Sequence, residues 1–187
     1  MALTFTNTSL PGIFIIEPDR FKDARGFFME TYHQRKYATG GMDRVFVQDN
    51  CSHSIKGTLR GLHYQLRRPQ AKLIYVITGE IFDVAADIRD GSPAFGKWVG
   101  THLSGENGRQ IFIPEGFAHG FCVLSDEADV LYKVTEFYIP DDECGILWSD
   151  PMLDIRWPLE KPLLSQRDRE APRLREIPDH RLPVYEV

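Results

Sequence analysis

Two histidines and one lysine are the residues of this chain best suited to proton chemistry. His63 lies in the segment 57–65, His119 ends the segment 108–119, and Lys72 lies between them. A neutral imidazole, with an ordinary pKa of about 6.5, can take a proton near neutral pH. A lysine ammonium donates hydrogen bonds only and carries a positive charge. A single histidine is more often a satisfied core residue, and a single lysine a surface charge, so their meaning depends on the surrounding segments.

Short strands are the elements that must position these residues. Residues 72–89 contain two β-rich runs on either side of Thr78-Gly79-Glu80, which predicts a β-hairpin. Further runs are bounded by Gly, Pro, Asn, Asp or Ser: Gly12–Glu17, Trp98–Leu103, Gln110–Ile113, Gly120–Leu124 and Asp129–Ile139. Strands this frequent, with almost no helical periodicity between them, indicate a sandwich or closed barrel of the jelly-roll kind.

Helical segments are expected to be few and short. Only Glu30–Thr39 and Pro162–Glu170 have a helical pattern. From Ala171 onward the chain contains three prolines, which predicts an irregular tail over the surface.

The run 129–139 constrains two aromatic residues. Alternation in a strand would place Tyr132 and Tyr138 on the same face. Core-filling rings with solvated hydroxyls are the more ordinary explanation of such a pair when it is considered alone. The pattern therefore predicts only that both rings face one space.

Length and charge exclude several classes of protein. The 187 residues are enough for one domain, and 22 Lys and Arg against 27 Asp and Glu leave a net charge of −5. This balance argues against a dedicated nucleic-acid or membrane-surface binder. No run approaches the roughly 18 apolar residues of a membrane span, and the first residues lack a signal-peptide pattern. Cys51, Cys122 and Cys144 have no paired spacing, so we expect reduced thiols in a cytoplasmic protein.

The segments around the histidines resemble the two motifs of the cupin superfamily of small β-barrels. The first motif is matched in its outer spacings by Gly57 to His63 and Lys72 to Gly79; the second is matched by Gly108, Pro114, Gly116 and His119, with Val123 in place of its Asn. In metal-binding cupins three His and one Glu hold a divalent ion. Here Gln65 replaces the second His and Lys72 replaces the Glu. Because an ammonium repels a metal ion, the resemblance implies no metal, and a barrel suited to an anion or to developing negative charge.

Nine short segments narrow the resemblance to one family. In chain order they are Arg25–Glu30, Val47–Asn50, Leu59–Gln65, Asp87–Arg89, Ser92–Gly96, Ile113–Phe121, Tyr132–Thr135, Trp148–Pro151 and Leu164–Asp168. They resemble the dTDP-4-dehydrorhamnose 3,5-epimerases, over about residues 4–175. The resemblance implies an all-β, cupin-type jelly-roll β-barrel with a few short peripheral helices. It also implies a single epimerase domain over 1–187, with a tail at 176–187, and no cofactor.

The family's reaction assigns roles to four residues. A 4-keto sugar has acidic protons at C3 and C5, because removal of either gives an enolate shared with the C4 oxygen. The resemblance makes His63 the base and Asp168 the partner that steadies its tautomer and its imidazolium. Lys72 would face the C4 oxygen, and Tyr132 would be the acid that delivers a proton to the opposite face.

The remaining matched residues would bind the nucleotide and sugar. Arg25 and Arg60 are implied as pyrophosphate partners, because a guanidinium can bind two oxygens at once. Tyr138 matches the aromatic residue that stacks on thymine. Nucleotide, ribose or ligand-edge contacts are implied for Glu30, Gln48, Asp49, Asn50, His119, Glu143 and Arg167.

The resemblance also bears on the oligomeric state and the substrate, and here it leaves alternatives open. The family exchanges the strand at Arg25–Glu30 across a two-fold interface, which implies a homodimer acting on a dTDP-sugar. A related epimerase that inverts only C5 or only C3 of a modified sugar would carry the same catalytic residues. A metal-dependent cupin dioxygenase and a non-catalytic sugar-nucleotide sensor are the other readings that the barrel allows. Gln65 and Lys72 argue against the dioxygenase, and the joint presence of base, acid and enolate stabiliser argues against the sensor.

Overall fold

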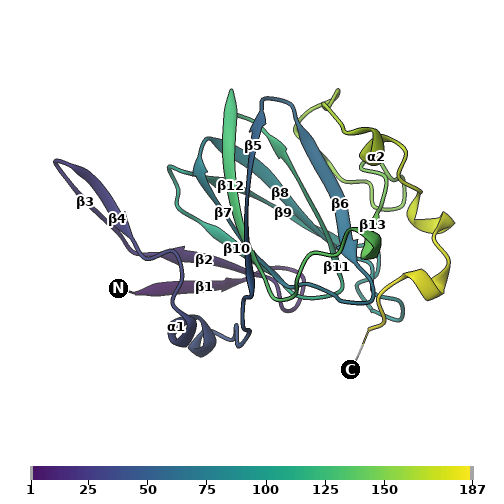
Figure 1. The fold of residues 1–187 in the computed structure, drawn as a ribbon, viewed down its shortest axis with the longest axis horizontal. Coiled ribbons are helices and arrows are strands. Elements are labelled where there is room, and N and C mark those ends of the chain that lie inside the picture. Colours follow the sequence, from purple (N-terminus) through teal and green to yellow (C-terminus); the bar gives the residue numbers. More distant parts are fainter. Residues whose placement is uncertain (1, 186–187) are drawn as a thin grey trace.

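Two antiparallel sheets face each other in the computed structural model, which describes residues 2–185 (Figure 1). The first sheet has the order β1 (Leu3–Asn7), β2 (Phe14–Pro18), β10 (Gln110–Ile113), β7 (Lys72–Thr78), β12 (Glu127–Val134) and β5 (Gln48–Ile55). The second has the order β13 (Glu143–Gly145), β6 (Leu59–Gln65), β11 (Phe117–Val123), β8 (Glu80–Asp87) and β9 (Trp98–Ser104). The predicted all-β fold of two facing sheets with a few short helices is confirmed by this arrangement.

Alternation along the strands builds the core between the sheets. Ile74 and Val76 of β7 pack there with Val130 of β12 from one sheet, and Ile81 and Ala85 of β8 from the other. These side chains alternate with residues that face outward, as a strand requires. The interior is therefore apolar over most of its length, and the few polar residues that point into it stand out.

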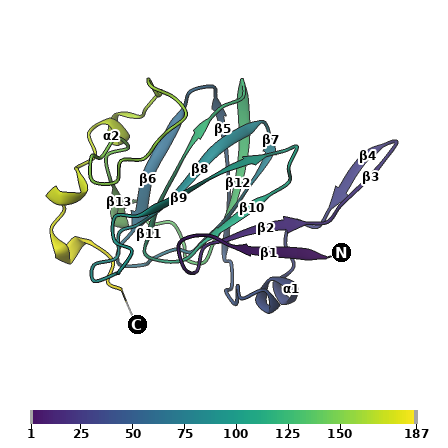
Figure 2. The ribbon, with the colours of Figure 1, turned by 180° about the vertical axis from the view of Figure 1, so that it is seen from behind.

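Each sheet is also covered on its outer face. Helix α1 (Gln34–Thr39) brings Tyr37 against Leu73 and Phe112 on the back of the first sheet. The C-terminal segment covers the back of the second sheet, where Leu174 and Leu182 pack against strand residues (Figure 2).

This covering corrects the prediction of an irregular surface tail from Ala171. The segment forms two short 3-10 helices, η2 (Leu174–Glu176) and η3 (Asp179–Arg181), and Leu174 is buried. Asp90 and Val184 form a β-bridge that ties the end of the segment to the barrel. Residues 186 and 187, also assigned to the tail, lie outside the described residues.

The predicted hairpin over residues 72–89 is wrong in its pairing. Two strands do meet at Gly79, but β7 pairs with β10 and β12, whereas β8 pairs with β11 and β9 in the other sheet. Gly79 has φ +81°, and a Cβ there would lie 2.1 Å from the Glu127 carbonyl oxygen. The chain thus turns a tight corner between the sheets, and a local sequence pattern does not distinguish such a corner from a hairpin.

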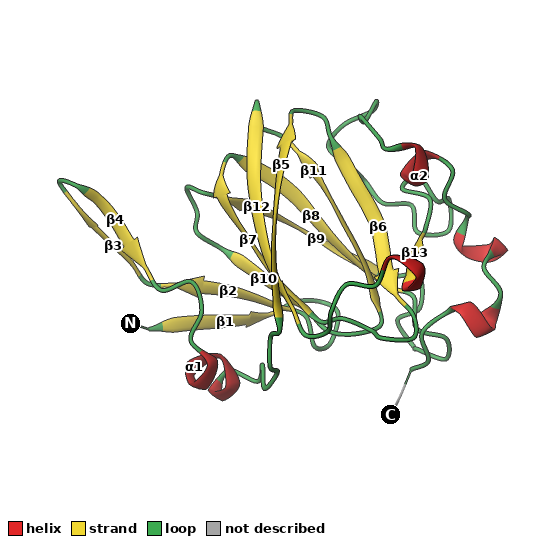
Figure 3. Ribbon diagram, viewed as in Figure 1, coloured by secondary structure: helices red, strands yellow, loops and turns green. Residues whose placement is uncertain are grey.

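Other predicted elements match with shifted ends. Gln110–Ile113 is confirmed as β10, and the helices are shorter than predicted: α1 within Glu30–Thr39, and α2 (Gln166–Arg169) within Pro162–Glu170 (Figure 3). Strands β1, β3, β5, β6 and β13 lie outside the runs predicted from residue pattern, and β4 was expected only from the family resemblance.

Strands β3 (Arg20–Asp23) and β4 (Gly26–Met29) form a separate hairpin that projects from the barrel (Figure 1). Phe21, Phe27 and Phe28 are all more than half exposed on it. Among the described residues, no helix has the length and apolar character that crossing a membrane requires.

Candidate active site

Polar side chains from both sheets surround a cavity of about 360 Å³ in the barrel. Strands β5, β7 and β12 contribute from the first sheet, and β6 and β11 from the second; α2 and the segment around β13 close one side. Ten residues predicted from the sequence line it: Asn50, Arg60, His63, Lys72, His119, Tyr132, Tyr138, Glu143, Arg167 and Asp168. Residues far apart in the sequence are thus gathered in one place.

His63 on β6 forms a close pair with Asp168 on α2. The imidazole Nε2 lies 2.5 Å from Asp168 Oδ1, and the Ser165 hydroxyl donates to Asp168 Oδ2 at 2.8 Å. Burial raises the pKa of Asp168, but the hydrogen bond and charge of His63, together with hydrogen bonds from Ser165 and the Gly61 N–H, outweigh it and hold the pKa below its usual value. A carboxylate accepts only, so Nε2 carries the proton and Nδ1 keeps its lone pair.

Ser165 explains why Asp168 is held so firmly. It is the N-cap of α2: its hydroxyl accepts from the Asp168 N–H at 3.1 Å and donates back to the carboxylate. A serine at this position satisfies a free N–H of the first helical turn. The short helix therefore presents a carboxylate of fixed orientation to His63.

His119 on β11 forms a second histidine–aspartate pair, deeper in the barrel. Its Nε2 lies 2.8 Å from Oδ2 of Asp83 on β8, and both residues are buried. Burial lowers the pKa of His119, partly opposed by the Asp83 carboxylate. The imidazole is therefore held neutral. Among residues 2–185, Asp83 Oδ1 has no hydrogen-bond partner.

Lys72 at the start of β7 brings a positive charge to the same space. Burial lowers its pKa to about 8, while the Glu143 and Asp83 carboxylates pull in the opposite direction. No hydrogen bond or ion pair within the described residues involves its ammonium. The group is thus charged near neutral pH and free to donate to a ligand.

Tyr132 on β12 shares the inner face of its sheet with Lys72. Tyr132 is opposite Ile74 in the β12–β7 register, two residues along from Lys72. Burial raises the pKa of Tyr132, and the Arg60 guanidinium only partly offsets this. Its hydroxyl therefore stays protonated at neutral pH, on the sheet opposite His63.

A cluster at the rim links four predicted residues. Glu143 accepts from the Tyr138 hydroxyl at 3.0 Å and pairs with the Arg167 guanidinium. Its other oxygen lies 3.8 Å from His63 Nδ1. Burial and the Glu143 carboxylate raise the pKa of Tyr138. Arg60 donates to the Ser54 hydroxyl at 3.0 Å and lines the cavity from β6.

The two tyrosines line one cavity, but the reason given by strand alternation is wrong. Strand β12 ends at Val134, so Tyr138 lies beyond it in the loop that leads to η1 (Pro140–Asp142). Tyr138 reaches the cavity because that loop folds back over the rim.

Four predicted binding residues do not line this cavity. Asp49 points to the other face of β5, where Lys133 donates to it at 2.7 Å. Gln48 accepts from the Tyr138 N–H at 3.0 Å and donates to Asn50 Oδ1 at 2.8 Å. Arg25 lies at the tip of the β3–β4 hairpin beside Asp23, and Glu30 pairs with Lys36.

Sequence reasoning missed Asp83, Ser52, Gln70, Phe121 and Ser165. A signal existed for Asp83, which is a single carboxylate between apolar neighbours in the run 81–86. Alternation places it on the same face as Ile81 and Ala85, where a charge needs a functional or structural reason. Nothing in the sequence distinguishes the other four.

The positions that bind metal in other cupins have different partners here. Gln65 is buried, and its amide is used by backbone groups: it donates to the Arg68 and Phe137 carbonyls and accepts from the Ile139 N–H. Within residues 2–185, no three His, Cys, Asp or Glu side chains are grouped so that they could hold an ion. The donors that remain at the pocket are suited to an anionic ligand.

Comparisons with known proteins agree with this geometry. A family model described as dTDP-4-dehydrorhamnose 3,5-epimerase matches residues 7–176. An enzyme of that name from Shigella flexneri is 57% identical over 163 residues, which cover 86% of this chain and 90% of that protein. A dTDP-4-dehydrorhamnose 3-epimerase from Streptomyces niveus is 40% identical, over 94% of this chain and 86% of its own length.

A solved structure is similar over the full length. The dTDP-6-deoxy-D-glucose-3,5-epimerase of Legionella pneumophila, in complex with dTDP-4-keto-L-rhamnose, superposes with a TM-score of 0.97. It is 50% identical, and the match covers 100% of both chains.

Proposed function

The chain belongs to the dTDP-4-dehydrorhamnose 3,5-epimerase family, and from that premise we propose how its pocket inverts two carbons of a sugar carried by dTDP. The enzyme is an isomerase of dTDP-L-rhamnose biosynthesis. It converts dTDP-4-dehydro-6-deoxy-α-D-glucose to dTDP-4-dehydro-β-L-rhamnose. The observation that carries the mechanism is that His63, paired with Asp168 of α2, lies on one sheet, and Lys72 and Tyr132 lie on the other.

His63 is the base in this mechanism. Its Nε2 is bound to Asp168, so Nδ1 holds the lone pair that takes a proton from C3 or C5. The imidazolium that forms is stabilised by Asp168 on one side and by Glu143, 3.8 Å from Nδ1, on the other. Because both carbons are acidic through the same C4 carbonyl, one base serves both inversions.

Lys72 stabilises the enolate. The electron pair left by the proton moves to the C4 oxygen, and the Lys72 ammonium donates to that oxygen. A preorganised donor of this kind lowers the barrier by roughly 3–4 kcal/mol. The barrel supports the role because Lys72 is desolvated and has a lowered pKa of about 8, which leaves it charged at neutral pH.

Tyr132 completes the inversion. Its hydroxyl is protonated at neutral pH because burial raises its pKa, and it gives that proton to the carbon from the face opposite His63. The enolate electrons then return to carbon and the C4 carbonyl re-forms. Exchange with solvent restores His63 and Tyr132 for the second carbon.

The rim cluster binds the nucleotide. Arg60 and Arg167 are suited to the diphosphate, and the half-exposed ring of Tyr138 to stacking on thymine. Asn50 and His119 contact the sugar and ribose in this proposal. Because Gln48 and Asp49 have other partners in this chain, their part is indirect.

We further propose a cytoplasmic homodimer in which the β3–β4 hairpin of one subunit completes the pocket of the other. The hairpin projects from the barrel (Figure 1), and it exposes Phe21 and Phe28, which are opposite each other in the β3–β4 register, on one face and Phe27 on the other. Such a surface needs a partner, and Arg25 and Glu30 at its ends carry the charges that a diphosphate and a ribose recognise. Size-exclusion chromatography with light scattering, before and after Phe28→Asp, measures whether a dimer depends on this surface.

The experiment that tests the function counts the inverted carbons. The protein is incubated with the 4-keto-6-deoxyglucose nucleotide in deuterated water, and the product is examined by NMR after reduction. Deuterium at both C3 and C5 with L-rhamno configuration is expected. Inversion at C3 alone would favour the second candidate function, a mono-epimerase. The similarity to the Streptomyces niveus 3-epimerase is the observation that supports this candidate. Nucleotide binding without exchange would overturn both.

A further inference from the structure

Gln65 lies on β6 two residues beyond His63 and makes no contact with the cavity, yet it is one of the few buried polar residues of the barrel. Its Nε2 donates to the Arg68 carbonyl at 2.8 Å and to the Phe137 carbonyl at 3.2 Å. Its Oε1 accepts from the Ile139 N–H at 2.7 Å. Both amide hydrogens are used, so the side chain is committed to the loop that follows β12.

That loop carries Tyr138 between the two backbone groups that Gln65 holds. The Tyr138 N–H itself donates to Gln48 at 3.0 Å, so three successive residues are fixed by two glutamines. The Tyr138 ring is 44% exposed, and its hydroxyl contacts Glu143. The position of the ring therefore depends on the backbone hydrogen bonds of residues 137–139 and on the hydroxyl contact to Glu143.

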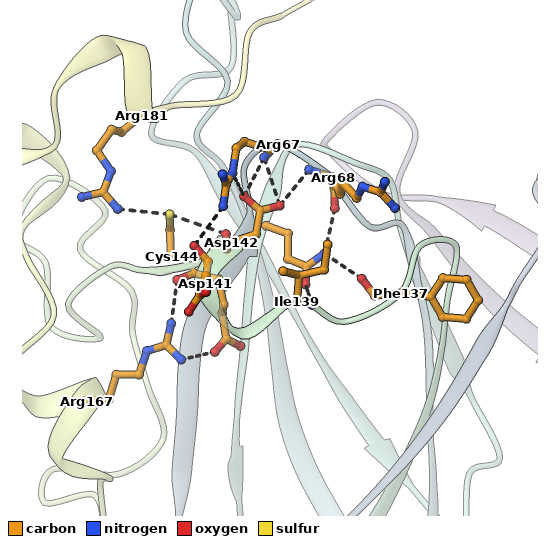
Figure 4. A network of polar contacts seen from close by, with 11 residues as sticks. Arg67, Arg68, Phe137, Ile139, Asp141, Asp142, Cys144, Arg167 and Arg181 are labelled. Atoms are coloured by element: carbon orange, nitrogen blue, oxygen red, sulfur yellow. Dashed lines mark hydrogen bonds and ion pairs between the residues drawn. The ribbon is translucent and has the colours of Figure 1, made fainter.

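The far end of the same loop is anchored to the same neighbouring segment (Figure 4). Asp142 is buried and accepts from the Arg67 and Arg68 N–H groups at 2.9 and 2.8 Å. Burial raises its pKa, but these hydrogen bonds, with that of the Arg67 guanidinium, outweigh it and keep the pKa low. Residues 65–68 and 137–142 thus form one polar unit, of which Gln65 is the only part on the strand that carries His63.

We propose that Gln65 is a positioning residue for the nucleotide end of the pocket: it holds the 137–139 backbone so that Tyr138 is set for its ligand before the ligand arrives. The inference rests on the proposed function, in which Tyr138 stacks on thymine. A loop that is already ordered loses less conformational entropy when the ligand binds, so the ligand binds more tightly. We expect proton transfer at His63 to be unaffected, because the Gln65 amide hydrogen-bonds to the 68 and 137–139 backbone and not to His63, Lys72 or Tyr132.

Two substitutions at Gln65 test the role. Gln65→Leu removes all three hydrogen bonds at similar volume, and Gln65→Glu keeps the acceptor and removes both donors. Without these hydrogen bonds the 137–139 backbone must be ordered when the ligand binds, so dTDP affinity should fall by about tenfold. KM should rise with it, while kcat at saturating substrate stays close to that of the wild type. Calorimetric titration with dTDP and steady-state kinetics measure the two effects.

Tyr64→Phe is the matched control. Tyr64 is the preceding residue of β6, it faces the opposite side, and its hydroxyl donates to the Arg181 carbonyl at 2.8 Å. This variant also loses a hydrogen bond to backbone from the same strand, but from a distant segment. It should lower the melting temperature without weakening dTDP binding.

A double-mutant cycle with Tyr138→Ala separates positioning from general loss of structure. If Gln65 acts through the ring, Gln65→Leu should cost little further affinity once the ring is gone. An equal loss in both backgrounds, or wild-type affinity in Gln65→Leu, would overturn the inference. If Gln65→Leu does not fold, Gln65→Glu carries the same cycle. Failure of the wild type to bind dTDP would instead refute the proposed function, so the two are distinguished.

Discussion

The two cavity histidines each form a pair with an aspartate, and these two pairs share one geometry but differ in their surroundings. In each, an imidazole Nε2 is bound to a carboxylate, and His63 and His119 are direct neighbours across the β6–β11 register. Asp168 has both oxygens engaged, by His63 and by Ser165. Asp83 is fully buried and leaves Oδ1 without a partner among residues 2–185.

This difference shows that a histidine–aspartate pair does not by itself determine what its histidine does. Nδ1 of His63 faces Glu143, so a proton taken there is stabilised from both sides of the ring. Burial instead lowers the pKa of His119, and no second carboxylate is paired with it among the described residues. The negative charge of Asp83 also acts on Lys72. We therefore expect the first pair to move protons and the second to supply charge and orientation.

Removing the two imidazoles separately is the strongest test of that difference. His63→Ala should abolish deuterium incorporation at both C3 and C5, a loss of about 10²–10⁴-fold for a general base. His119→Ala should leave measurable exchange at both carbons. The measurement is NMR of recovered substrate and product in deuterated water. Near-native exchange in His63→Ala would mean that another residue is the base.

Tyr132→Phe tests whether the acid lies outside both pairs, on the opposite sheet. The substitution keeps the ring and removes the hydroxyl, so packing changes little. Proton abstraction by His63 should continue while reprotonation from the far face fails, and net epimerisation should fall by about 10²-fold or more relative to exchange. Affinity for dTDP should barely change, in contrast to Tyr138→Ala, which should lose roughly 1–3 kcal/mol of binding. Undiminished epimerisation in Tyr132→Phe would show that the Tyr132 hydroxyl is not the acid.

Asp168→Ala should have an intermediate effect. The variant loses a hydrogen bond to a charged group, which is worth about 1.5–3 kcal/mol, so exchange should slow by roughly ten- to a hundredfold. Titration with dTDP checks that binding is kept. The matched control is Ser165→Ala, which loosens the carboxylate but leaves it in place and should slow exchange less. A loss as complete as that of His63→Ala would show that Asp168 does more than orient the ring.

Some features of this site depend on residues close together in the sequence and could be predicted. Others depend on residues far apart and could not. Resemblance to the cupin motifs identified His63, Lys72 and His119, because each motif is a short segment with its own internal spacing, although the strand pairing that brings the three residues together is long-range. We expected Asp49 to contact the ligand together with Gln48 and Asn50. Alternation along β5 instead points Asp49 to the outer face, where Lys133 donates to it. The hairpin over 72–89 failed because strand pairing depends on partners such as β10 and β12, which lie far along the chain.

Asp83→Asn should change the pH profile more than the rate at neutral pH. Lys72 must be charged to stabilise the enolate, so activity is present below its pKa of about 8 and is lost as pH rises through it. Burial lowers that pKa, and the Glu143 and Asp83 carboxylates oppose the shift. Without the Asp83 charge the alkaline limb of kcat should move to lower pH, by roughly one unit. An unmoved limb would mean that the second pair does not act on Lys72.

Removal of metal ions should have no effect, although two histidines on neighbouring strands are the start of a metal site. Both Nε2 atoms are occupied by aspartates, and the third and fourth ligand positions hold Gln65 and Lys72. The Gln65 amide is committed to the Phe137 and Ile139 backbone, and an ammonium repels a cation. Dialysis against a strong chelator should leave kcat/KM equal to that of enzyme dialysed against buffer alone. A loss restored specifically by iron, manganese or zinc would show that the two imidazoles bind a metal together, and the contrast between a proton-moving pair and a charge-supplying pair would then fail.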